Sequence, residues 1–144
     1  MTQFLVPLDG SAYSEHALDY VIARAKQTPG ETHVHVVNVQ TPLSGVNVKM
    51  FVSTDSLQTY YREEGQKIVE PAVAKLKAKG LAATAHIGVG DAGKTVVDFA
   101  TQVRAQEIVM GSHGRGALAG AFMGSVAQKV VHLASIPVVL VKSS

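Results

Sequence analysis

Two glycine-rich segments of this chain have residue types and spacings that can hold a phosphate group. In the first, "HIGVGDAGKTVVDFA", the pattern G-x-x-x-x-G-K-T is matched by Gly88, Gly93, Lys94 and Thr95. Where this pattern binds phosphate, backbone N–H groups surround the phosphates, the lysine reaches the outer ones and the threonine holds magnesium. The segment therefore raises the hypothesis of a P-loop-type NTPase site at Gly88–Thr95.

The rest of the chain does not supply the other parts of such a site. A P-loop works with an acidic residue at the end of a later strand, which orients magnesium and water. The two later apolar runs end in "IVMGS" and "VVLVKSS", without a carboxylate. The same residues are also typical of a plain helix start, with Asp91 capping the helix and Lys94 in solvent. The sequence favours this second interpretation.

The second segment, "GSHGRGALAGAFMGSVAQKVVHLA", begins at Gly111 directly after an apolar run. Its glycines let backbone N–H groups turn inward, and it leads into a helix predicted to start at Gly124. The free N–H groups and positive dipole end of such a helix form an anion site. The Ser125 hydroxyl can bind the same phosphate, and His113 or Arg115 can add a charge-assisted hydrogen bond. The alternative is a surface loop without a ligand.

The elements that position these segments alternate between strands and helices. Apolar and β-branched runs predict strands at 4–8, 33–39, 81–87, 107–110 and 138–141. Helical spacing predicts a first helix from Ser11 or Ser14 to Pro29–Gly30, then helices at about 54–79, 93–104 and 124–134. We expect a loop at 41–53, and Pro71 should bend or interrupt the second helix. The alternation calls for a parallel sheet covered by helices on both faces.

Composition indicates one globular domain, 1–144. Of the 144 residues 47% are apolar and 17% charged, and the interspersed charges sum to +2, which argues against a nucleic-acid partner recognised by bulk charge. The chain has no cysteine, so disulfides and Cys-based zinc sites are excluded. No apolar run approaches the roughly 18 residues of a transmembrane helix. We therefore expect no membrane insertion and a cytoplasmic location.

Two histidines share one face of a predicted strand. His33 and His35 alternate with apolar residues, so both side chains point the same way. They can in principle share a metal ion, but no third ligand of fitting spacing accompanies them. We expect no metal site there.

Several segments resemble the universal stress protein family. The spacing G-x2-G-x9-G-S from Gly111 to Ser125 is similar to the nucleotide-binding signature of that family. "VPLDGSAYSEHAL" resembles its first strand and turn, and "GSVAQKVVHLASIPVVLVK" resembles its last helix and strand. The resemblance covers nearly the whole chain and is loosest from 41 to 79. Gln106 and Glu107 depart from the family pattern, which often has an acidic and an apolar residue there.

The resemblance implies a fold and a ligand. The fold is a doubly wound, adenine nucleotide alpha hydrolase-like α/β domain, with a five-stranded parallel sheet of order 3-2-1-4-5 and four helices. The ligand is ATP, or AMP or ADP, lying across the carboxyl ends of strands 1 and 4, with Mg²⁺ accompanying the nucleotide. The nucleotide-binding residues that follow from the segments and the resemblance are Pro7, Asp9, Ser11, Val39, Gly111, His113, Gly114, Arg115, Gly124, Ser125 and Val126.

The resemblance also implies roles within that set. Asp9 contacts the ribose or, through magnesium, the phosphates, and Pro7 and Val39 flank the adenine. Gly111 and Gly114 approach the ribose and phosphates. Gly124, Ser125 and the N–H of Val126 hold the phosphates.

The implied function is that of a nucleotide-binding regulatory module in the stress response. Homodimers would form through the last strand, Val138–Val141, an otherwise exposed apolar edge. A regulatory protein partner is expected, of unknown identity. The alternatives are a slow ATPase that uses the same pocket and the P-loop-type NTPase. We assign no catalytic residue, because no general base is apparent beside the phosphates.

Overall fold

Strands and helices alternate along the computed structural model, which describes residues 1–51, 53–114 and 123–142. The strands are β1 (Thr2–Pro7), β2 (Thr32–Gln40), β3 (Ala82–Val89), β4 (Glu107–Gly111) and β5 (Val138–Val141). The α-helices are α1 (Ala12–Gln27), α2 (Thr54–Ala78), α3 (Ala92–Gln102) and α4 (Ser125–Leu133), and the short 3-10 helix η1 (Gly45–Met50) precedes α2. None of the helices in these ranges is long and apolar enough to cross a membrane.

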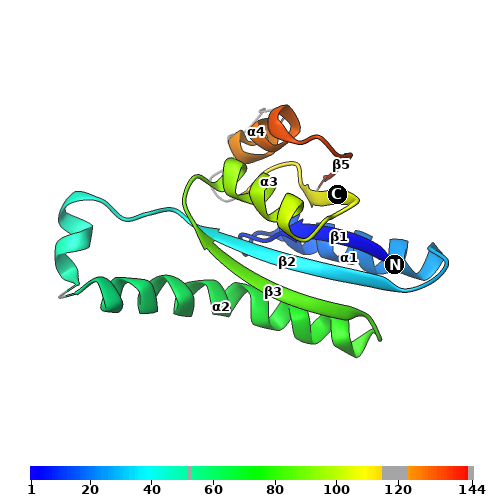
Figure 1. Ribbon diagram of the computed structural model, residues 1–144, viewed down its shortest axis with the longest axis horizontal. Coiled ribbons are helices and arrows are strands. Elements are labelled where there is room, and N and C mark those ends of the chain that lie inside the picture. The colour runs from blue at the N-terminus through cyan, green and yellow to red at the C-terminus, as the bar shows by residue number, and fades with distance from the viewer. Residues whose placement is uncertain (52, 115–122, 143–144) are drawn as a thin grey trace.

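All the strands run parallel in one sheet of order β3-β2-β1-β4-β5, which confirms the predicted order (Figure 1). Strand β1 lies in the middle, where Leu5 is opposite His35 of β2 on one side and Ile108 of β4 on the other. The chain first builds the sheet from β1 towards β3 and then returns to add β4 and β5 on the opposite side. Ligands of doubly wound sheets bind at the carboxyl ends of the two strands where this reversal occurs, here β1 and β4.

Each face of the sheet is covered by two helices (Figure 1). Successive residues of a strand point to opposite faces, so the neighbours Val36 and Val37 belong to different cores. Val36 packs with apolar residues of α1 and α2. Val37 packs with apolar residues of α3 and α4. The near-continuous apolar sequence of β2 follows from this burial on both faces.

Local signals set the ends of the helices. The Ser11 hydroxyl accepts a hydrogen bond from the Ser14 N–H at 3.3 Å and caps α1. The Asp91 carboxylate accepts one from the Lys94 N–H at 3.1 Å and caps α3. Beyond α2, Gly80 has a φ of 80°, a left-handed conformation that glycine adopts without strain.

Three details differ from the expectation. The segment 41–53 is not all loop, because it contains η1. Strand β3 continues to Val89, and α3 already begins at Ala92, so the turn between them is shorter than predicted. Helix α2 runs through Pro71 without interruption. Proline removes only one helical hydrogen bond, and the helix is buried along one side by residues that include Val69 and Leu76, so tertiary packing outweighs that loss.

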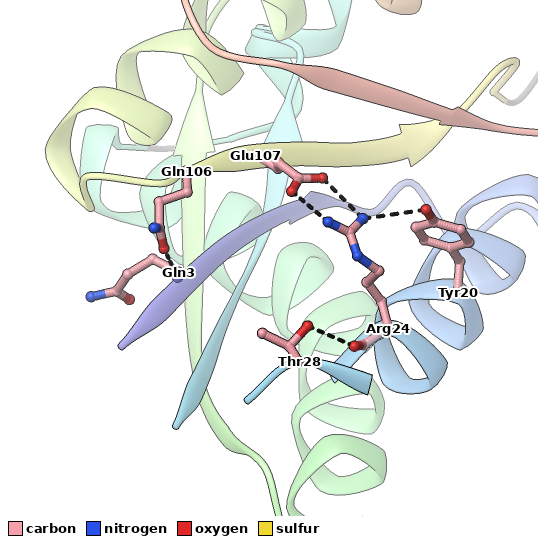
Figure 2. Close-up of polar contacts among 6 residues, drawn as sticks. All are labelled: Gln3, Tyr20, Arg24, Thr28, Gln106 and Glu107. Carbon is pink, nitrogen blue, oxygen red and sulfur yellow. Dashed lines mark hydrogen bonds and ion pairs between the residues drawn. The ribbon is translucent and has the colours of Figure 1, made fainter. Parts of the chain in front are cut away.

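Gln106 and Glu107, the two departures from the family pattern, have side-chain contacts at the start of β4 (Figure 2). The Gln106 side-chain oxygen accepts a hydrogen bond from the Gln3 N–H at 2.7 Å. The Glu107 carboxylate accepts hydrogen bonds from Arg24 of α1. These contacts fasten β4 to β1 and α1 at the amino ends of the strands, away from the carboxyl ends where a ligand is expected.

Candidate functional site

A cavity of about 580 Å³ lies at the carboxyl ends of β1 and β4. Its walls come from the ends of β1, β2 and β4 and from the first turns of α1, α3 and α4. The predicted residues that line it are Pro7, Asp9, Val39, Gly111, His113, Gly114, Gly124, Ser125 and Val126. Ser11 caps α1 beside the cavity but is not among its lining residues. Arg115 lies outside the residues that the structure describes.

Asp9 and Gly114 lie against each other in the wall of the cavity, although 105 positions separate them in the sequence. A Cβ atom on Gly114 would collide with the Asp9 carboxylate, so glycine is the residue that allows this approach. The other Asp9 oxygen, Oδ1, accepts a hydrogen bond from the Ser11 N–H at 2.9 Å. This turn fixes the Asp9 carboxylate at the end of β1. Asp9 is the one acidic residue among the described residues that line the cavity.

The first turn of α4 is open to an anion. Helices α1 and α3 also begin at the cavity, but side chains of Ser11 and Asp91 cap them. The N-cap of α4 is Gly124, and no side chain within the described residues caps this helix. Its free N–H groups and positive dipole end therefore face the cavity uncompensated, with Ser125 as the first helical residue. Of the three helix starts, this one suits a phosphate.

The two ends of the glycine-rich segment meet at the base of α4. The Gly124 N–H donates to the Ser112 carbonyl at 2.7 Å. A Cβ atom on Gly124 would lie 3.2 Å from the His113 Cα, a tight contact. The backbone just beyond the end of β4 is thereby held against the start of α4, so that both line the same cavity.

His113 is positioned on the cavity wall by its neighbours. Its Nδ1 lies 3.0 Å from the Ser112 hydroxyl, and its ring packs against that of Tyr13 with 5.2 Å between the centroids. These contacts place an imidazole close to the α4 N-terminus, where it can interact with a phosphate.

The other half of the cavity is apolar. Its lining includes residues that we did not predict from the sequence, among them Val37, Ala92, Val96 and Met110. In the sequence these residues look like ordinary core or helix positions, and no local signal distinguishes them. An apolar compartment joined to an anion site matches a ligand with a flat ring at one end and phosphate at the other.

The G-x-x-x-x-G-K-T segment is not arranged as a phosphate loop in the structure. Gly88 and Val89 belong to strand β3, and α3 begins at Ala92. Space beside Gly88 is filled by the Thr95 side chain, since a Cβ on Gly88 would lie 2.9 Å from the Thr95 Cγ2. Gly93 is in contact with the side chain of Lys129 from α4.

The charge at this helix start also opposes phosphate. The Asp91 carboxylate takes the Lys94 N–H that a phosphate loop would offer to its ligand. A hydrogen bond from Lys129, 2.8 Å away, lowers the pKa of Asp91 and keeps it charged. Lys94 itself is exposed. The geometry therefore favours the plain helix start over the P-loop.

The histidines of β2 form a cluster outside the cavity. The rings of His33 and His35 stack at a centroid distance of 4.2 Å, and the His35 Nδ1 lies 3.0 Å from the His86 Nε2 of β3. Across residues 1–51, 53–114 and 123–142, no three His, Asp or Glu side chains are arranged to hold a metal ion.

Comparison with protein families finds a match over nearly the whole chain. The model of the family described as "Universal stress protein family" matches residues 1–142. The chain is 31% identical to universal stress protein YxiE of Bacillus subtilis, an alignment that covers 97% of this chain and 98% of YxiE.

Solved structures share the fold. The structure of the hypothetical protein MJ0577, 28% identical, superposes with a TM-score of 0.86 over 99% of this chain and 96% of that one. An Arabidopsis thaliana universal stress protein family member with AMP bound superposes with a TM-score of 0.72, covering 100% of this chain and 93% of the other. At 18% identity this second likeness shows the fold alone.

Proposed function

The chain belongs to the universal stress protein family, and we propose that it is a regulatory module that binds an adenine nucleotide in the cavity between β1 and β4. The observation that carries the proposal is the uncapped N-terminus of α4, which opens into a cavity whose other half is apolar. The AMP complex of the Arabidopsis neighbour supports an adenine ligand for this fold.

The proposed pose places each part of the nucleotide against matching chemistry. The adenine lies in the apolar half, flanked by Pro7 and Val39, and the ribose lies next to Asp9. The phosphates rest on the free N–H groups at the start of α4, with the Ser125 hydroxyl as a further donor. The backbones of Gly111 and Gly114 line this approach. His113, Arg115, Gly124 and Val126 complete the proposed phosphate-binding set.

Magnesium would accompany the phosphates of ATP or ADP. Carboxylate oxygen is a hard ligand that suits Mg²⁺, and Asp9 is held at the end of β1 beside the proposed phosphate position. In this proposal Asp9 reaches the metal that the nucleotide carries and does not form a metal site by itself.

We further propose that a single domain, 1–144, acts in the cytoplasm, where adenine nucleotides are available, and controls an unidentified protein partner. Homodimerisation through β5 would support this role. Strand β5 is the last strand of the sheet and its four side chains, Val138–Val141, are only partly buried. Pairing with a second copy would cover this apolar edge.

Slow ATP hydrolysis in the same cavity is a second candidate, because Asp9 and His113 both line it. Phosphate release from Mg-ATP by the purified protein distinguishes an ATPase from a binding module. If phosphate is released no faster than in a blank without protein, the ATPase is excluded and nucleotide binding remains as the proposed function.

The test of the main proposal is nucleotide-induced thermal stabilisation. At a ligand concentration about 100-fold above Kd, Mg-ATP should stabilise the protein by about 2.7 kcal/mol, which raises the Tm by several degrees. Lys94→Ala should keep this gain. Asp9→Ala should reduce it, and Gly114→Asp should abolish it by placing a bulky carboxylate against Asp9 and the phosphates.

Gly30→Asp is the matched control for Gly114→Asp. Gly30 has a φ of 84°, a left-handed conformation that aspartate tolerates better than most residues. A Cβ at this position would have no atom within 4 Å, and the site lies away from the cavity. This variant should show the full gain. If Lys94→Ala lost the stabilisation by Mg-ATP and Gly114→Asp kept it, the nucleotide would bind at the Gly88–Thr95 segment instead.

A further inference from the structure

A hydrogen-bond network behind the cavity connects β2 to the residue that precedes Asp9. We propose that Asn38 is a positioning residue for Asp9, so that nucleotide affinity depends on a side chain outside the cavity. This inference rests on the proposed nucleotide site. Asn38 is 4% exposed and is not among the described lining residues.

Asn38 stands where the sequence pattern calls for an apolar residue. It continues the alternation of Val34 and Val36, which are fully buried in the core under α1 and α2. Burying an amide in such a place costs free energy unless its polar atoms are hydrogen-bonded. Both ends of the Asn38 amide are bonded here, which indicates a specific role for the group.

The donor end of the amide holds the backbone next to Asp9. The Asn38 Nδ2 donates to the Leu8 carbonyl at 2.8 Å, and the Leu8 N–H donates to the Val37 carbonyl at 2.8 Å. Strand β1 ends at Pro7, so Leu8 lies beyond the regular pairing. The Leu8 carbonyl belongs to the peptide group that carries the Asp9 nitrogen. Rotation of that peptide would displace the Asp9 carboxylate from Ser11 and Gly114.

The acceptor end of the Asn38 amide fixes the orientation of its donor end. The Gln40 Nε2 donates to the Asn38 Oδ1 at 2.6 Å, which fixes the amide with its nitrogen towards Leu8. The Gln40 carbonyl accepts from the Gly90 N–H at 3.0 Å and so ties the end of β2 to the turn before α3. Val39, proposed to flank the adenine, lies between these two residues. The network thus links the proposed adenine wall with the proposed ribose contact.

The experiment measures the Kd of Mg-ATP by calorimetry. Asn38→Leu has a similar volume but no donor, and we expect about tenfold weaker binding, the effect of losing one aligned hydrogen bond. Gln40→Leu, at a partly buried position, frees the Asn38 amide to rotate, and we expect about threefold weaker binding. Thr32→Val on the same strand also replaces a buried polar side chain, one whose hydroxyl has no described partner, and should bind like wild type.

A double-mutant cycle separates positioning from general destabilisation. If Asn38 acts through Asp9, adding Asn38→Leu to Asp9→Asn should weaken binding much less than it does in wild type. Equal fold-losses in both backgrounds would overturn the inference, as would wild-type affinity in both Asn38→Leu and Gln40→Leu. If Asn38→Leu does not fold, the same cycle with Gln40→Leu decides. Absence of Mg-ATP binding by wild type would instead refute the proposed function, and this inference with it.

Discussion

Both carboxylate oxygens of Glu107 accept hydrogen bonds from the guanidinium of Arg24, at 3.1 and 2.7 Å (Figure 2). The pair joins α1 to the first residue of β4 across 83 positions of sequence. Arg24 also donates to the Tyr20 hydroxyl and lies over the Phe4 ring, 5.7 Å from its centroid. The hydrogen bonds to Glu107 raise the pKa of Arg24, so its guanidinium stays charged at every physiological pH.

Glu107→Gln should therefore lower the stability of the fold. A bidentate pair with side chains 34% and 20% exposed is worth more than a surface pair, and we expect a loss of about 1–2 kcal/mol in the free energy of unfolding. The pair Lys67–Glu64, whose lysine is 73% exposed, is the control, because Glu64→Gln should cost much less. Urea denaturation of both variants measures the difference. Equal losses would mean that the Arg24 pair contributes no more than a surface pair.

Two glycines should respond differently to alanine. A Cβ on Gly111 would lie 2.6 Å from the Tyr13 Cβ and 2.9 Å from the Tyr13 backbone carbon, neither of which can move freely. Gly111→Ala should cost about 2–3 kcal/mol through overpacking. A Cβ on Gly93 would lie 2.8 Å from the Lys129 Cβ, which also cannot move freely, but alanine favours the helix over glycine by about 1 kcal/mol. Gly93→Ala should therefore also be destabilising in thermal denaturation, but by less than Gly111→Ala.

The protonation state of His35 follows from its neighbours. The Gln3 Oε1 is an acceptor, so the His35 Nε2, 2.9 Å away, carries the proton and donates. The His35 Nδ1 then accepts from the His86 Nε2–H at 3.0 Å. Burial, followed by the nearby His33 and His86, lowers the pKa of His35 to about 4, and burial together with His33 lowers that of His86.

Acid should destabilise the fold through this cluster. The unfolded chain takes up a proton at His35 near pH 6.5, whereas the folded chain does so near pH 4. Stability from the neutral ring is fully present above pH 6.5 and is lost as the pH falls from 6.5 towards 4. Between pH 7 and pH 5 we expect wild type to lose about 2 kcal/mol more than His35→Phe, which cannot titrate there. Tm measured at both pH values tests this, and equal losses in the two proteins would exclude the cluster as the cause.

Pro71→Ala should stabilise the protein. Pro71 is exposed inside α2, where proline lacks the N–H of a helical hydrogen bond and crowds the preceding turn. Alanine restores the hydrogen bond, and the gain exceeds the entropy that proline removes from the unfolded chain, so we expect about 1–2 kcal/mol. Thermal denaturation should show a Tm several degrees higher, with Glu70→Ala unchanged as the neighbouring control. A lower Tm for Pro71→Ala would mean that the ring itself supports packing of the helix.

Much of the fold could be predicted from the sequence, because local chemistry controls local structure. The alternation of apolar runs with helical spacing located all the strands and α-helices of the described chain within a few residues. Caps at Ser11 and Asp91 and the stop at Gly80 act over one turn of chain and could be identified by residue type. The strand order did not follow from these signals. It came from the resemblance to a family, since alternation alone permits several parallel sheets.

The candidate site was predictable where its residues carry unusual chemistry. Asp9, Gly114 and Ser125 differ from a plain core or loop, and the sheet brings them to one cavity. The nucleotide-binding roles of these residues, and of Arg115, stay predictions. For the G-x-x-x-x-G-K-T match the sequence already favoured a plain helix start, because neither later strand ends in a carboxylate. The structure adds that β3 ends at Val89 and α3 begins at Ala92.

The sequence by itself determined the class of fold, the identity of the helix starts and the glycine-rich segment before α4, all of which depend on residues close together in the chain. Only the tertiary structure decided that Val37, Val96 and Met110 share a cavity with Asp9, and that Asn38 holds the backbone beside it. These relationships join residues about thirty or more positions apart. The register of the parallel strands and the packing of helices on them decide which of these residues meet. Neither can be deduced from a local sequence pattern.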